Sequence, residues 1–61
     1  MILERLFLEA DLAGLRPLEW ERLGTGDVKC TVGKGNWQCA ARGANGRDAL
    51  ENLLRRMRVI K

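Results

Sequence analysis

The sequence predicts an α+β domain with an N-terminal helical segment, a central antiparallel β-hairpin and a C-terminal amphipathic helix packed on the sheet. Three observations predict this class. Apolar residues recur at helical spacing near both ends of the chain. Apolar and polar residues alternate over residues 28–42, on either side of a glycine-rich stretch. The length of 61 residues leaves room for one small core, so we treat residues 1–61 as a single domain.

The first predicted element is a helix over residues 2–13. Its apolar residues fall on one helical face, and Gly14 is a suitable stop after the last turn. Because the segment is short, a strand over residues 5–10 stays open as the alternative.

A second, short helix is predicted from Pro17 to Leu23. Proline suits the first position of a helix, and Gly24 follows the last residue. With this helix, residues 1–24 form the helical part of the domain.

A β-hairpin is predicted over residues 28–42, with a turn at residues 33–36, where two glycines and an asparagine tolerate positive φ. Counting across this four-residue loop puts three pairs on the face toward the core: Val32 with Trp37, Cys30 with Cys39, and Val28 with Ala41. A two-stranded ribbon cannot bury its own face. Both helices, or a third strand from the first half of the chain, must therefore cover it.

The last helix is predicted from Gly46 to Arg58. Asn45 is a suitable N-cap, with Asp48 three residues further on, and Glu51 can pair with a base four residues later. The residues expected to face the core are Ala49, Leu50, Leu53, Leu54 and Met57.

The composition argues against catalysis. The chain has no His, Tyr or Ser, which removes the commonest metal ligand, general base and nucleophile. We expect no enzyme activity, cofactor, metal ion or small-molecule substrate. Cys30 and Cys39 are first interpreted as small core residues. A cross-strand disulfide, a four-thiolate metal site shared by two chains and a reactive thiol stay open.

Charge divides the chain near Gly24. Residues 1–24 carry a net charge of −2, and residues 25–61 carry +5. A positive surface in the second half suits the phosphates of a nucleic acid or a nucleoprotein. An acidic protein partner, or a solvated face whose cations favour the end of a helix, stays open. The candidate nucleic-acid-binding residues are Arg42, Arg47, Arg55, Arg56, Arg58 and Lys34.

Apolar side chains in the first half exceed what one small core needs. Leu8, Leu12 and Leu15 either fold under the segment at Pro17 or pair with a second copy, which would make the protein a homodimer. Trp20 is a candidate interface anchor. The alternative function is therefore a protein–protein interaction module, an inhibitor or adaptor that acts through its acidic half or Trp20. A phage origin is one interpretation of such a module. Trp37 is expected in the core.

Residues 37–54 resemble a strand-into-helix piece of two families. The run from Trp37 to Leu54, with Gly43, Asn45 and the helical stretch ALENLL, is similar to HicB-like antitoxins and, more faintly, to the last strand and helix of double-stranded RNA-binding domains. It lacks the Pro-Gly turn of the antitoxins and the paired lysines at the helix start of the RNA-binding domains. No functional residue is carried over from either family.

No apolar run approaches the roughly 20 residues that span a bilayer, so we expect no membrane partner. The start of the chain also lacks the basic region of a secretory signal. Two cysteines in such a chain suit a reducing compartment. We therefore expect a cytoplasmic protein, and a complete small polypeptide of prokaryotic or viral origin.

Overall fold

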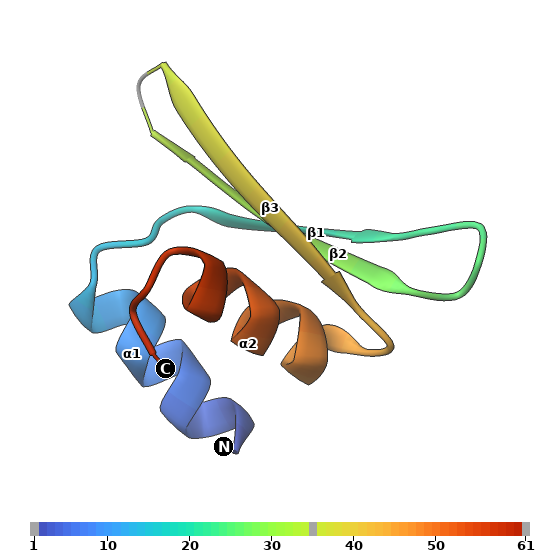
Figure 1. Cartoon of the computed structure of the whole chain (residues 1–61), viewed down its shortest axis with the longest axis horizontal. Coiled ribbons are helices and arrows are strands. Elements are labelled where there is room, and N and C mark those ends of the chain that lie inside the picture. The colour runs from blue at the N-terminus through green and yellow to red at the C-terminus, as the bar shows by residue number, and fades with distance from the viewer. Residues whose placement is uncertain (1, 35, 61) are drawn as a thin grey trace.

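The protein folds as two helices on one side of a three-stranded sheet. The computed structural model describes residues 2–34 and 36–60, without the side chain of Lys34. The elements are, in order, α1 (Leu3–Leu12), β1 (Leu18–Arg22), β2 (Val28–Lys34), β3 (Trp37–Gly43) and α2 (Gly46–Arg56). The sheet is antiparallel, in the order β1-β2-β3. Figure 1 shows both helices below the sheet, whose upper face stays open. The predicted α+β class is confirmed.

The sheet has a third strand where a short helix was predicted. Residues 18–22 form β1, so the helix expected from Pro17 to Leu23 is wrong, and so is the description of residues 1–24 as wholly helical. Leu18 and Trp20 lie opposite buried residues of β2, whereas Glu19 and Glu21 lie on the open face. This alternation has the period of a strand. The strand over residues 5–10 is also wrong, because those residues belong to α1.

The register of the β2–β3 hairpin differs from the predicted one by two residues. Cys30 pairs with Ala41, and Val32 pairs with Cys39, because the strands continue to Lys34 and Trp37 and leave a two-residue connection. Two-residue connections are the commonest in hairpins. A shift of two keeps every side chain on its predicted face. Of the predicted turn, Gly35 lies outside the described residues.

α2 contributes more residues to the core than any other element. As predicted, Asn45 caps this helix: its side-chain oxygen accepts a hydrogen bond from the Asp48 N–H at 2.9 Å. The predicted pair of Glu51 and Arg55 is present at 3.0 Å. The buried residues are Leu6, Ala10, Leu15, Cys30, Val32, Ala41, Ala49, Leu50, Leu53 and Leu54.

No helix in the described ranges is long and apolar enough to cross a membrane.

Trp37 is not a core residue, contrary to the prediction. It keeps 43% of its surface exposed. The two-residue connection places it at the tip of the hairpin, and Figure 1 shows this end of the hairpin rising away from the helices. A face can be buried only where a helix covers it, so the inner side of the tip stays exposed.

The end of β3 packs against the first turn of α2 at van der Waals distance. A Cβ atom on Gly43 would lie 2.4 Å from the Ala49 nitrogen and 2.6 Å from the Asp48 carbonyl carbon. Both neighbours are backbone atoms of a capped helix and cannot move aside separately. Glycine is therefore required at position 43 for steric reasons.

We predict that Gly43→Ala lowers the free energy of unfolding by about 2–3 kcal/mol, because the added methyl group overlaps backbone. Urea denaturation followed by circular dichroism measures this change. The matched control is Gly24→Ala, where no atom lies within 4 Å of the added Cβ, and there stability should stay within about 0.5 kcal/mol. Equal stability of the two variants would contradict the close approach.

Candidate functional site

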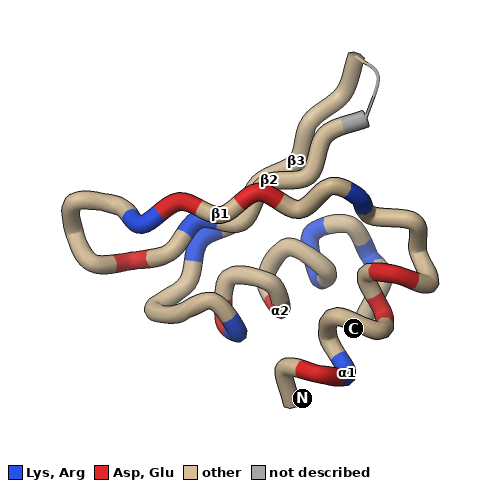
Figure 2. The backbone as a smooth tube through the Cα atoms, turned by 180° about the vertical axis from the view of Figure 1, so that it is seen from behind, with Lys and Arg blue, Asp and Glu red and all other residues tan. Residues whose placement is uncertain are grey.

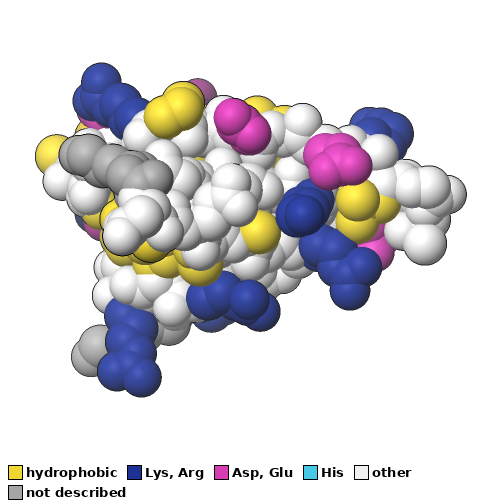
Figure 3. Space-filling view, turned by 90° about the horizontal axis from the view of Figure 1, so that it is seen from above, with side chains coloured by type: hydrophobic (Ala, Val, Ile, Leu, Met, Phe, Trp, Pro, Cys, Tyr) yellow, Lys and Arg dark blue, Asp and Glu magenta, His cyan; other side chains and the backbone are white. Residues whose placement is uncertain are grey.

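On the open face, the two edges of the sheet carry opposite charge. β1 exposes Glu19 and Glu21 there, while its Arg22 alternates onto the other face; β3 contains no acid and exposes Arg42. Figure 2 shows acidic positions along β1, and Figure 3 shows Lys and Arg side chains along the lower border of the open face. The charge difference between the two halves of the sequence thus becomes a difference between two edges.

The structure divides the six predicted basic residues into three groups. Arg47 pairs with Asp48 at 2.8 Å, and Arg55 pairs with Glu51, all within α2. Arg42, Arg56 and Arg58 are exposed, and the part of the chain that the structure describes offers them no ion pair. The side chain of Lys34 lies outside the described residues.

One hydrogen bond ties the open edge of β3 to α2. The Asn52 side-chain amide donates to the Arg42 carbonyl oxygen at 2.7 Å. Arg56 follows Asn52 by four residues, so it lies one turn further along the same side of the helix. Arg42 and Arg56 therefore border one edge, and Arg58 follows at the end of the helix. We call Arg42, Arg56 and Arg58 the basic edge.

Both helices end in the same motif, with different residues at its left-handed position. That position is Gly14 after α1, with φ of 72°, and Arg58 after α2, with φ of 61°. In each case two N–H groups return to the last turn, which is the Schellman pattern. The bonds are Gly14 N–H to Asp11 O (3.0 Å), Leu15 N–H to Ala10 O (3.0 Å), Arg58 N–H to Arg55 O (3.0 Å) and Val59 N–H to Leu54 O (2.8 Å).

The predicted protein-interface residues also divide. Leu8 and Leu12 on α1 keep 46% and 73% of their surface exposed. Leu15 is buried in the core, so it does not belong to a surface that a partner could contact. Trp20 is half exposed, and the centroid of its ring lies 6.1 Å from the centroid of the Phe7 ring. Phe7 is a surface residue that was not predicted, because helical spacing places it on the core face of α1. The homodimer through Leu8 and Leu12 stays a prediction.

The two cysteines are free, and the register separates them. Cys30 is buried, and this burial raises the pKa of its thiol from 9.0 to about 11. Cys39 is half buried. Within residues 2–34 and 36–60 no group of three or more Cys, Asp or Glu could hold a metal ion. The interpretation of the two cysteines as core packing residues therefore fits the buried Cys30 better than the half-buried Cys39.

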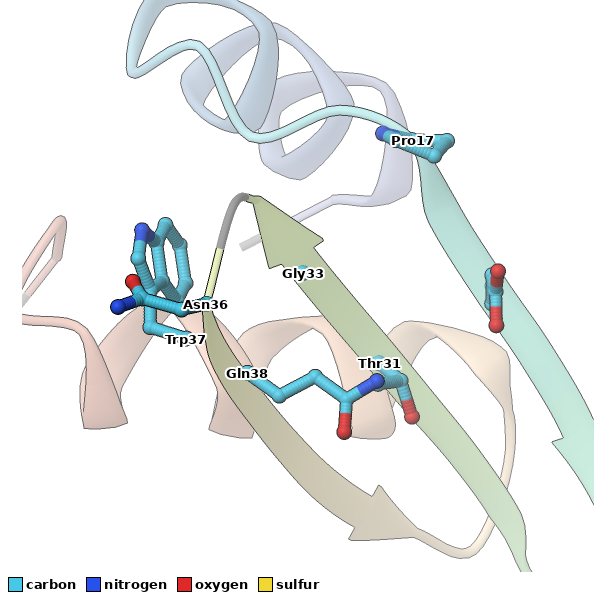
Figure 4. Close-up of a pocket in the computed structure, with 7 residues that line it drawn as sticks. Pro17, Thr31, Gly33, Asn36, Trp37 and Gln38 are labelled. Carbon is cyan, nitrogen blue, oxygen red and sulfur yellow. The ribbon is translucent and has the colours of Figure 1, made fainter.

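A hollow of about 380 Å³ lies on the open face near the hairpin tip. Figure 4 shows the Gln38 side chain extended toward Thr31, while the Trp37 indole lies beside Asn36 at the other end. Glu19 is the one charged group among the described residues that line it. The hollow thus lies outside the basic edge.

Residues 37–54 form one strand followed by one helix, β3 and α2. This agrees with the strand-into-helix resemblance at the level of secondary structure. Comparison with protein-family models, curated proteins and solved structures finds no match to this chain. The activities of the two resembling families are therefore not carried over.

We predict that only Cys39 reacts quickly with an aromatic disulfide reagent at pH 8, where about 0.1% of a thiol with a pKa near 11 is ionised. Cys30 should react only after denaturation. Because the pKa of this thiol is about 9.0 when unfolded and about 11 when folded, its burial also costs stability as pH rises from about 9 to 11. Cys30→Ala should keep the fast reaction and Cys39→Ser should remove it; fast reaction of both thiols would contradict the burial of Cys30.

Proposed function

We propose that this protein is a small, non-enzymatic regulator that acts in the cytoplasm and binds nucleic acid through the basic edge. Arginine suits this role, because its planar guanidinium donates paired hydrogen bonds to phosphate oxygens. Arg42, Arg56 and Arg58 are exposed. Their neighbours Arg47 and Arg55 form surface ion pairs with Asp48 and Glu51, and pairs of this kind contribute at most about 1 kcal/mol. The cytoplasmic setting is supported by the two free thiols.

The backbone of Arg58 is the observation that carries this proposal. A left-handed backbone costs a residue with a side chain about 1–2 kcal/mol, and the equivalent position after α1 is a glycine. A cation near the end of a helix recovers part of this cost, but Arg55 and Arg56 already occupy that last turn. The third arginine therefore costs stability that the fold does not require. Strained positions of this kind concentrate at functional sites.

The placement of the acids supports the same surface. Glu19 and Glu21 lie on the edge opposite β3, so they repel phosphate there and orient the protein with β3 and α2 toward the nucleic acid. The described strand positions that alternate onto the open face carry no aromatic ring, and Trp37, which lines the hollow at the hairpin tip, alternates onto the opposite face. We therefore propose contacts to the phosphate backbone, not a platform on which bases stack.

Salt dependence tests the proposal first. With contacts to about four phosphates, affinity for duplex DNA or duplex RNA should fall by about 100-fold between about 50 and 200 mM salt. Mobility-shift titrations measure it, with single-stranded DNA as a third probe. The double change Arg56→Glu with Arg58→Glu should weaken binding at least about tenfold and lower the salt slope by about two.

The matched control reverses two charges in the other half of the chain, Arg5→Glu with Arg22→Glu. It makes the same change in net charge, so a purely global electrostatic effect would weaken binding equally. A loss confined to Arg56 and Arg58 supports the basic edge. Equal losses, or no shift with any of the three nucleic acids, would contradict it.

Arg58→Gly separates stability from function. Glycine relieves the left-handed backbone, so the free energy of unfolding should rise by about 1 kcal/mol while nucleic-acid affinity falls. Chemical denaturation and mobility shift on the same sample measure both. A stabilised variant with unchanged affinity would show that Arg58 contacts no phosphate.

A further inference from the structure

An apolar groove lies beside the start of β1, between this strand and α1. It has a volume of about 360 Å³ and is lined by Phe7, Leu15, Pro17 and Leu18, with an ion pair of Asp11 and Arg16 at its rim. The Phe7 and Trp20 rings continue this apolar surface along β1, and each is more than 40% exposed. Half-exposed aromatic rings beside an apolar hollow are typical of a surface that binds another protein.

The backbone of β1 is open on the side away from β2. Among the described strands β1 pairs with β2 alone. Just beyond that ladder the Leu23 N–H donates to the Asp27 carbonyl oxygen at 2.8 Å, so this pair is a hydrogen-bonded one. Hydrogen-bonded and non-hydrogen-bonded pairs alternate along an antiparallel ladder. The N–H and C=O groups of Leu18, Trp20 and Arg22 therefore point to the open edge, where a further strand could bind them.

The side chains of β1 define the sequence of such a strand. Residues of an added strand that lie beside Leu18 and Trp20 would face α1 and the apolar groove. Residues beside Glu19 and Glu21 would lie on the open face and meet two carboxylates. Cross-strand pairs favour opposite charge and disfavour like charge. The matching segment alternates apolar and basic residues.

β2 already shows this pattern on the other side of β1. Its buried Cys30 and Val32 lie opposite Trp20 and Leu18, and Lys29 lies opposite Glu21, whereas the uncharged Thr31 lies opposite Glu19. By contrast, two copies of β1 placed edge to edge would bring Glu19 and Glu21 close to the same acids of the second copy. The charge of this edge therefore disfavours self-pairing and favours a basic partner.

We propose that β1 accepts a fourth strand from another protein, an extended segment that alternates apolar and basic residues. Backbone hydrogen bonds along the open edge supply affinity, and the groove and the two carboxylates select the sequence. This surface is separate from the basic edge, because β1 and β3 are opposite edges of the sheet.

A synthetic peptide of about seven residues that alternates Lys and Val tests the proposal, since about seven residues match the length of a strand. Titrated into the ¹⁵N-labelled protein, it should shift the amide signals of Leu18, Trp20 and Arg22 and the indole signal of Trp20. A peptide that alternates Glu and Val should bind at least tenfold more weakly. The double change Glu19→Lys with Glu21→Lys should reverse this preference while the fold is retained.

Three results would overturn the proposal. The first is the absence of shifts in β1, and the second is equal binding of the two peptides. The third is the appearance of the same β1 shifts when the protein alone is concentrated, because these shifts would then report dimerisation. Arg56→Glu with Arg58→Glu should leave peptide affinity unchanged, whereas Glu19→Lys with Glu21→Lys should not weaken binding to duplex nucleic acid. This pair of variants distinguishes failure of the β1 surface from failure of the basic edge.

Discussion

The close contact between Gly43 and the first turn of α2 is the constraint on which the rest of the structure depends. Two residues separate β3 from α2, so the chain must reverse at once, and only a glycine lets the Asp48 and Ala49 backbone approach. The helix then runs back below β3 with its leucine face toward the sheet. The Asn52 hydrogen bond to the Arg42 carbonyl fixes the same helix to the edge of that strand. α1 completes the core by packing against α2.

This arrangement separates the charges of a very small domain. Because β1 and β3 are the two outer strands, the acids of the first half and the bases of the second half lie on opposite edges. The acidic edge also borders an apolar groove, and the basic edge includes an arginine with a strained backbone. The two proposed surfaces therefore differ in chemistry, and one domain could join a nucleic acid to an extended segment of another protein that alternates apolar and basic residues.

Local signals allowed the closing helix to be predicted from the sequence, because its Asn45 cap and leucine face depend on neighbouring residues. The alternation of the hairpin predicted its faces but not its register, since Gly33 and Lys34 fit a strand as well as a turn. β1 was missed because a proline before a five-residue strand looks the same as one at a helix start. The exposure of Trp37, the shared edge of Arg42 and Arg56, and the left-handed Arg58 depend on tertiary packing, which periodicity does not reveal.

The most direct test of this account is a nuclear Overhauser measurement between Gly43 and α2. A proton replaces the Cβ atom that would lie 2.4 Å from the Ala49 nitrogen, so a Gly43 Hα proton should give a strong cross-peak to the Ala49 amide proton. A folded protein without the Gly43–Ala49 cross-peak would contradict the position of α2, and with it the basic edge.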